Sequence, residues 1–142
     1  MQRFKTRPQF QAALSGTMVA KSTHFALHRS GLDLNARESG HKLFPASGTW
    51  IGAMVPKRWA KRAVTRNTIK RQIYTVSTCL EQAVEPAAFL IRLRRDFSRQ
   101  VFLSASSAAL KDAVRAELMA LVQTASNVMA TANIASSQKA SS

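Results

Sequence analysis

The feature that most constrains this chain is a helical pattern over residues 59–84 whose apolar stripe becomes basic toward its N-terminal end. The stripe consists of Ile69, Ile73, Val76 and Leu80. At about 100° per residue, Arg62, Arg66 and Lys70 fall near the same azimuth as this stripe. Pro86 closes the helix. The pattern predicts that the C-terminal half of the helix packs on a sheet, while its N-terminal half overhangs into a groove and presents cations.

These cations belong to a block that contains no acidic residue. The chain has 142 residues, with 21 Lys and Arg against 7 Asp and Glu, so its net charge is +14. Residues 49–72 hold seven of the basic side chains: Lys57, Arg58, Lys61, Arg62, Arg66, Lys70 and Arg71. No carboxylate lies one helical turn away from them to form an ion pair. Because like charges repel, we expect a polyanionic partner to neutralise the block.

Composition narrows the class of protein further. Apolar residues make up 46% of the chain, enough for a core, but no apolar run approaches the roughly 18 residues that a membrane span needs. The single cysteine, Cys79, rules out an internal disulfide and a Cys-rich zinc site and fits a reducing compartment. The basic block carries few bulky apolar residues, which favours nucleic acid over an anionic membrane. We expect a soluble cytoplasmic protein.

The order of the predicted elements indicates an α+β fold. Helices and strands alternate as α-β-β-β-α-β-α, which predicts a small mixed four-stranded sheet packed by helices. The predicted elements are a helix over 8–14, strands over 17–20, 24–28 and 49–55, the helix over 59–84, a strand over 88–93, and a final helix capped by Ser104, Ser106 or Ser107. Residues 1–123 form the single predicted domain, with a loop insertion over 31–48 and an Ala/Ser-rich tail over 124–142 that we expect to be disordered.

Catalytic residues are not predicted in this chain. Hydrolysis of a phosphodiester with two metal ions needs converging carboxylates. Of the seven acidic residues, Glu81 and Glu85 alone are spaced i,i+4, and they lie at the far end of the helix from the cations. The three histidines have no matching acidic cluster. The sequence therefore predicts neither a catalytic residue nor a metal ligand in the protein.

Aromatic residues outside the basic helix allow two interpretations. Phe10 and Phe25 can stack on unpaired bases, which is a recognition mode that tolerates any base sequence. Both residues also lie at spacings typical of core positions. His28, on a predicted strand, can stack or donate to a phosphate, or it can be an ordinary surface residue.

The segment Lys61–Arg71 resembles the signature helix of the bacterial ribonuclease P protein component. Its pattern is filled by Lys57, Arg58, Ala63, Arg66, Asn67, Lys70 and Arg71. The resemblance extends over residues 3–123, including Arg7-Pro8-Gln9-Phe10 and the strand 90–95. It implies a ribosomal protein S5 domain 2-like fold and the role of accessory protein subunit in an endoribonuclease. In that family the RNA subunit performs the hydrolysis with Mg²⁺, and the 5′ leader is removed from precursor tRNA.

The resemblance also implies two groups of site residues. Contacts to the catalytic RNA are expected from Lys57, Arg58, Lys61, Arg62, Arg66, Asn67, Lys70 and Arg71. A cleft for the single-stranded leader is expected from Phe10, Leu14, Phe25, His28 and Arg92. Four residues depart from the family pattern: Leu14 in place of a second Phe, His28 in place of a Tyr, Thr68 in place of a third Arg, and Tyr74 in place of a further Arg.

The expected partners are therefore the catalytic RNA and the leader of precursor tRNA. Mg²⁺ is expected to be held mainly by the RNA, and neither a membrane nor a stable protein partner is expected. The alternative is a basic structural protein that binds ribosomal RNA, which shares the size, charge and fold class. A DNA-binding regulator is disfavoured because the sequence contains no helix-turn-helix pattern.

Overall fold

A computed structural model describes residues 2–31, 48–97 and 108–141 of the chain. Its elements are β1 (Gln2–Arg3), α1 (Arg7–Leu14), β2 (Thr17–Lys21), β3 (Phe25–Ser30), β4 (Trp50–Met54), α2 (Ala63–Ala83), β5 (Ala88–Leu93) and α3 (Ala108–Ser141). The predicted α+β class and the predicted order of its seven elements are confirmed, with β1 added in front. The predicted loop insertion over 31–48 and the serines expected to cap α3 lie almost entirely outside the described residues.

The described strands form one mixed sheet in the order β1-β4-β5-β3-β2. β4 pairs in parallel with both β1 and β5, while β3 pairs antiparallel with β5 and with β2. The prediction of four strands was wrong by one, because Gln2 and Phe4 donate backbone hydrogen bonds to the Thr49 and Ile51 carbonyls and make β1. A strand of two residues is too short to show an alternating pattern in the sequence.

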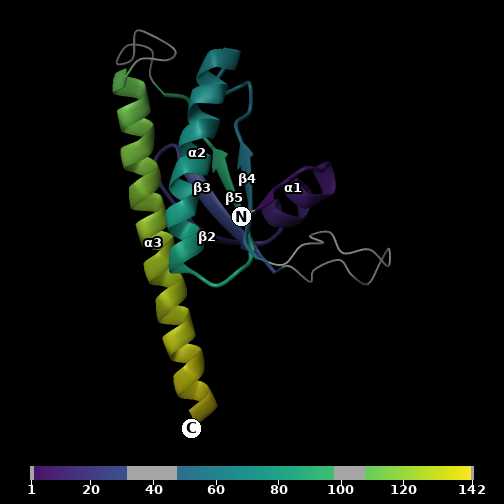
Figure 1. The fold of residues 1–142 in the computed structure, drawn as a ribbon, viewed down its shortest axis with the longest axis vertical. Helices are drawn as coiled ribbons and strands as arrows, with labels where there is room; N and C mark the ends of the chain where they lie inside the picture. The colour runs from purple at the N-terminus through teal and green to yellow at the C-terminus, as the bar shows by residue number, and fades with distance from the viewer. Residues whose placement is uncertain (1, 32–47, 98–107, 142) are drawn as a thin grey trace.

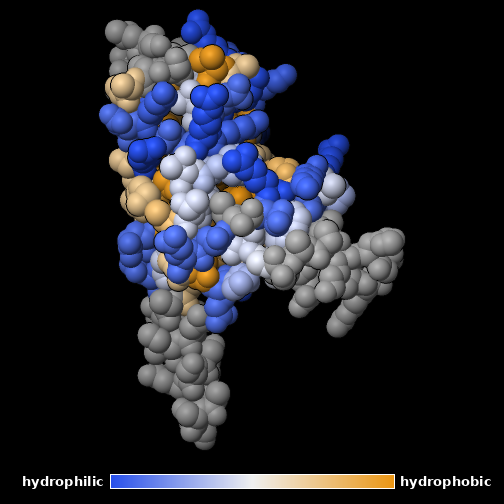
Figure 2. Space-filling view, in the orientation of Figure 1, coloured by the Kyte–Doolittle hydropathy of each residue, from blue (hydrophilic) through white to orange (hydrophobic). Residues whose placement is uncertain are grey.

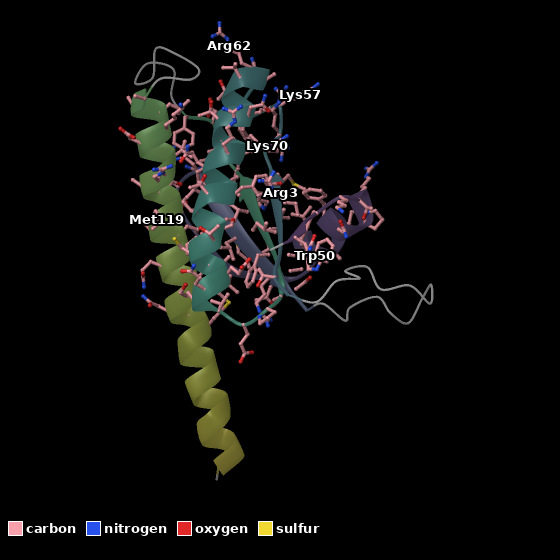
Figure 3. The ribbon with its side chains drawn as sticks, viewed as in Figure 1. Arg3, Trp50, Lys57, Arg62, Lys70 and Met119 are labelled. Carbon is pink, nitrogen blue, oxygen red and sulfur yellow. The ribbon has the colours of Figure 1, made fainter. Side chains whose placement is uncertain are left out.

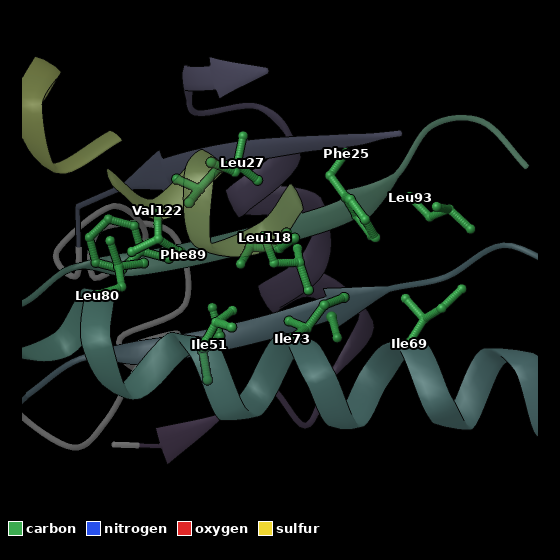
Figure 4. Close-up of a cluster of buried hydrophobic side chains, with 14 of the residues drawn as sticks. Phe25, Leu27, Ile51, Ile69, Ile73, Leu80, Phe89, Leu93, Leu118 and Val122 are labelled. Carbon is green, nitrogen blue, oxygen red and sulfur yellow. The ribbon is translucent and has the colours of Figure 1, made fainter. Parts of the chain in front are cut away.

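Helices α2 and α3 lie side by side on one face of the sheet (Figure 1). The main core lies between these helices and the strands (Figure 4). The apolar stripe of α2 is fully buried there, as the sequence predicts, and α3 contributes Leu110, Val114, Leu118 and Leu121. This packing fixes which side of α2 is left open.

Helix α1 covers the opposite face of the sheet. Thr6 and Gln9 form a capping box, in which Gln9 donates its backbone N–H to the Thr6 hydroxyl and its side chain accepts from the Thr6 N–H at 3.0 Å. A smaller apolar cluster under α1 contains Phe4, Ala13, Trp50, Ala88 and Leu90. The Phe4 ring lies directly over Gly52 in β4, where an added Cβ would come within 2.3 Å of a ring carbon. Gly52 thus lets α1 and the N-terminal segment approach the sheet.

The two long helices differ from their predicted bounds. Helix α2 begins at Ala63 rather than at residue 59, because residues 56–60 form a turn in which the Pro56 carbonyl accepts from the Trp59 and Ala60 N–H groups. Helix α3 continues past residue 124 to Ser141, where the composition favours disorder. The side chain of Ala125 is buried, and Met129 packs against the core. Packing of these residues and the high helix propensity of alanine account for the difference.

Candidate nucleic-acid interface

The N-terminal part of α2 overhangs the sheet. Buried side chains in α2 begin only at Thr68, whereas Ala63, Val64 and Asn67 are exposed. Figure 3 shows Arg62 at the free end of the helix, with Lys57 and Lys70 near it. In Figure 2, hydrophilic residues dominate this end of the molecule. The overhang that the sequence predicts is therefore present.

The cations of this overhang are accessible and have no acidic partner. Lys57, Arg58, Lys61, Arg62, Asn67 and Arg71 are exposed, while Arg66 and Lys70 are half-buried. Within the described parts of the chain, none of the seven basic side chains forms an ion pair with a carboxylate. We refer to these eight residues, Asn67 included, as the basic surface. Its charge is not neutralised by any described residue of the protein.

Arg66 differs from the other cations because it also stabilises the local fold. Its Nη1 donates to the backbone carbonyls of Ala60 at 3.0 Å and Lys61 at 2.8 Å. These bonds tie the start of α2 to the turn before it. The spacing of the basic residues predicts an RNA contact here, but it gives no sign of a bond to a carbonyl five or six residues earlier.

The first turn of α2 carries no protein cap. Arg62 occupies the N-cap position and makes no side-chain capping bond, because a guanidinium has only donors. There is no acidic residue in the first turn either. The free N–H groups of a helix start carry a partial positive charge, and this charge adds to that of Lys61 and Arg62. The helix start is therefore suited to an anionic group from outside the protein.

A further cation borders the basic surface from a different strand. The Arg3 guanidinium, from β1, lies 3.9 Å from the ring centroid of Tyr74 on α2. Tyr74 is one helical turn after Lys70, half-buried and packed against the edge of the main core. Arg3 could not be identified from the sequence, because its placement depends on the pairing of β1 with β4.

Four of the five predicted leader-cleft residues lie on the α1 face of the sheet. Phe10 in α1 is half-buried, edge-on to Phe4 with centroids 5.1 Å apart, and Leu14 at the end of α1 is 37% exposed. His28 on β3 and Arg92 on β5 share this face, and Arg92 Nε donates to His28 Nε2 at 3.0 Å. The structure brings His28 and Arg92 into contact, and the role of these four residues in binding the leader stays a prediction.

Phe25 does not belong to this group. It is fully buried in the core under α2 and α3, on the other face of the sheet, with its ring centroid 5.9 Å from that of Phe97. Successive side chains of a strand point to opposite faces, so Phe25 and His28, three residues apart, cannot both face α1. The assignment of Phe25 to the leader cleft was wrong, and its alternative interpretation as a core residue is correct.

His28 is neutral in this arrangement. Burial and, secondarily, the Arg92 charge lower the pKa of His28 below its ordinary value of 6.5. The hydrogen bond gives the same answer independently: Arg92 can only donate, so His28 Nε2 must be unprotonated to accept. The imidazole proton therefore sits on Nδ1.

The donor set of the interface does not suit a protein-held Mg²⁺. Hard cations prefer several oxygen ligands, mostly carboxylates, whereas the basic surface offers ammonium and guanidinium groups. Among the described residues, no three His, Cys, Asp or Glu side chains gather in one place. No helix among the described residues is long and apolar enough to cross a membrane.

Comparison with known proteins settles the family. A family model described as "Ribonuclease P" matches residues 1–125 of this chain. The chain belongs to the ribonuclease P protein component family. It is 32% identical over 114 residues to the ribonuclease P protein component of Bordetella parapertussis, covering 78% of this chain and 80% of that one. It is 32% identical over 123 residues to that of Ralstonia pickettii, covering 87% and 78%.

A solved structure supports the family fold. The RNase P protein of Staphylococcus aureus superposes with a TM-score of 0.62 at 16% sequence identity, covering 88% of this chain and 95% of that chain. Members of this family are protein components of a tRNA-processing ribonucleoprotein endoribonuclease. The family that the sequence resembles is thus confirmed.

Proposed function

We propose that this chain binds the catalytic RNA of ribonuclease P through its basic surface and the 5′ leader of precursor tRNA through the α1 face of its sheet. In this role it assists the Mg²⁺-dependent removal of the leader. One observation carries the proposal: seven cations cluster around the free end of α2, and no described carboxylate neutralises them.

The residue types suit a folded RNA. Arg62, Arg66 and Lys70 follow each other at intervals of one helical turn, about 6 Å, which is close to the phosphate repeat of a nucleic-acid strand. Guanidinium groups bind phosphate with two parallel hydrogen bonds. Asn67 adds a donor and an acceptor for a 2′-hydroxyl or a base edge. By supplying fixed cations, the protein lowers the Mg²⁺ concentration that the RNA needs to bind its substrate.

The α1 face suits an unpaired strand. Phe10 offers a half-buried ring on which a base can stack, and Arg92 offers a charge for the backbone. Neither contact reads a base sequence, as recognition of variable leaders requires. We assign the hydrolysis itself to the RNA subunit and the Mg²⁺ that it holds, since the basic surface has no group that could activate water or hold the ion.

Reconstitution of the cleavage reaction tests this function. Purified protein should leave precursor tRNA intact by itself. Added to its cognate RNA subunit at limiting Mg²⁺, it should raise the rate of leader removal, and excess Mg²⁺ should reduce the benefit. Absence of any stimulation at every Mg²⁺ concentration, together with co-sedimentation with a ribosomal subunit, would instead support the structural ribosomal alternative.

A further inference from the structure

The pairing of His28 with Arg92 has a consequence beyond binding of the leader in general. His28 is 94% buried on the α1 face, with a relative exposure of 6%. Its Nε2 accepts from Arg92 Nε, while its Nδ1 is buried and has no hydrogen-bond partner among the described residues. Neither a carboxylate nor a carbonyl there fixes the ring from its other side. The hydrogen bond to Arg92 is therefore the one interaction among the described residues that orients this imidazole through a ring nitrogen.

This bond selects which edge of the guanidinium remains available. Arg92 donates through Nε, the side-on position, so the end-on edge formed by Nη1 and Nη2 is free of described partners. Arg92 is half-buried and pairs with Ala26 of β3 and Met54 of β4, which places it in the middle of the sheet. A guanidinium whose Nε is held by a neutral acceptor is pre-organised to donate two parallel hydrogen bonds from Nη1 and Nη2 to a phosphate.

We propose that His28 is a positioning residue: its unprotonated imidazole holds Arg92 so that the Nη1–Nη2 edge binds a backbone phosphate of the single-stranded leader, and protonation of His28 releases this contact. The inference rests on the proposed function and adds to it a phosphate subsite with a dependence on pH. A protonated His28 cannot accept the bond, and it would place a second positive charge beside Arg92.

Among the described residues, the elements around His28 supply no carboxylate that could mask this effect. In β5 the charged residue is Arg92 itself, in β2 it is the exposed Lys21, and in α1 it is the exposed Arg7. Arg29, next to His28 in β3, alternates to the other face of the sheet. No acidic residue occurs in these four elements, so nothing there favours the protonated imidazole.

The test measures how much the leader contributes to affinity as a function of pH. The assembled ribonucleoprotein is titrated with mature tRNA and with a non-cleavable precursor between pH 8 and pH 5, and the ratio of the two dissociation constants is taken. For the wild type, the ratio should be constant above pH 6.5 and should fall at lower pH as His28 is protonated, by about tenfold, since one charge-assisted contact is lost. His28→Gln keeps an acceptor that does not titrate, so its ratio should stay constant across this range.

The possible results distinguish a failure of this inference from a failure of the proposed function. A ratio near one at pH 7.5 for the wild type would mean that the leader is not bound, and the proposed function would fail. A clear ratio at pH 7.5 that is flat with pH in the wild type, or that falls equally in His28→Gln, would overturn the inference alone. Arg92→Lys keeps the charge but lacks the fork, and it should lower the ratio at pH 7.5 while mature tRNA binds as before.

An NMR titration of the wild-type protein needs no variant. The His28 ring signals should titrate below pH 6.5, and the Arg92 Nε–H signal should shift with the same midpoint. If the Arg92 signal does not respond while His28 titrates, the coupling does not exist and the proposal is wrong.

Discussion

Removing two cations from the open side of α2 should weaken the dependence of RNA binding on salt by a predictable amount. Lys70→Gln combined with Arg71→Gln is the cleanest change, because neither side chain has a described partner inside the protein. Arg66 is less suitable, since its bonds to the Ala60 and Lys61 carbonyls also stabilise the fold. The double substitution therefore tests RNA contacts rather than folding.

The magnitude follows from the number of phosphates neutralised. If all seven cations of the basic surface contact RNA phosphates, the logarithm of the association constant should fall with the logarithm of salt concentration at a slope of about −5 to −6. Each cation contributes about −0.7 to −0.9 to this slope. The double variant should therefore show a slope of about −3.5 to −4.5.

The assay is a filter-binding or fluorescence titration of the catalytic RNA at several KCl concentrations. A matched control, Lys21→Gln with Lys111→Gln, removes the same charge from exposed positions on β2 and α3. Its slope should equal that of the wild type. If the α2 variant keeps the wild-type slope, or if the control loses as much, the cations act as a diffuse net charge and the assignment of the basic surface is wrong.

Three further changes have defined outcomes. Gly52→Ala places a methyl group against the Phe4 ring and should lower stability by about 1–3 kcal/mol in thermal denaturation; an unchanged melting temperature would contradict this packing. Burial raises the pKa of Glu117, but the hydrogen bonds that its carboxylate accepts, including those from His24, outweigh burial and bring the pKa below 4.5. The ionised Glu117 therefore stabilises the fold above pH 4.5, and this stabilisation is lost as the pH falls through the lowered pKa. Denaturant unfolding across pH 3–7 should show this loss in the wild type and a weaker pH dependence in Glu117→Gln. Phe10→Ala should weaken binding of precursor tRNA by about 1–3 kcal/mol and leave mature tRNA unaffected; equal losses for both would remove Phe10 from the leader site.

Much of the fold could be predicted because its elements carry strong local patterns. The stripe from Ile69 to Leu80 gave the packing side of α2, and the same periodicity indicated that the N-terminal half of the helix would overhang the sheet. β1 could not be predicted, since it exists only through pairing with β4. The length of α3 was underestimated because Ala-rich composition alone does not show that Ala125 and Met129 have a core to pack against.

The residue types of the candidate site could be predicted from the sequence, but much of its geometry could not. Charge and spacing located the basic surface, but they did not show that Arg66 is bonded to the turn before α2. Phe25 was misplaced because a phenylalanine on a strand gives no sign of which face it occupies until the register is known. The bond between His28 and Arg92 joins positions 64 residues apart, and no local pattern could reveal it.

The most direct test of the account asks which surface touches the catalytic RNA. A photoreactive group is attached through Asn67→Cys on the basic surface, or through Val128→Cys on exposed α3, each in a Cys79→Ser background that removes the native thiol. After assembly with the RNA subunit and irradiation, the probe at position 67 should crosslink to that RNA and the probe at position 128 should not. Crosslinks from position 128 with none from position 67 would contradict the central claim.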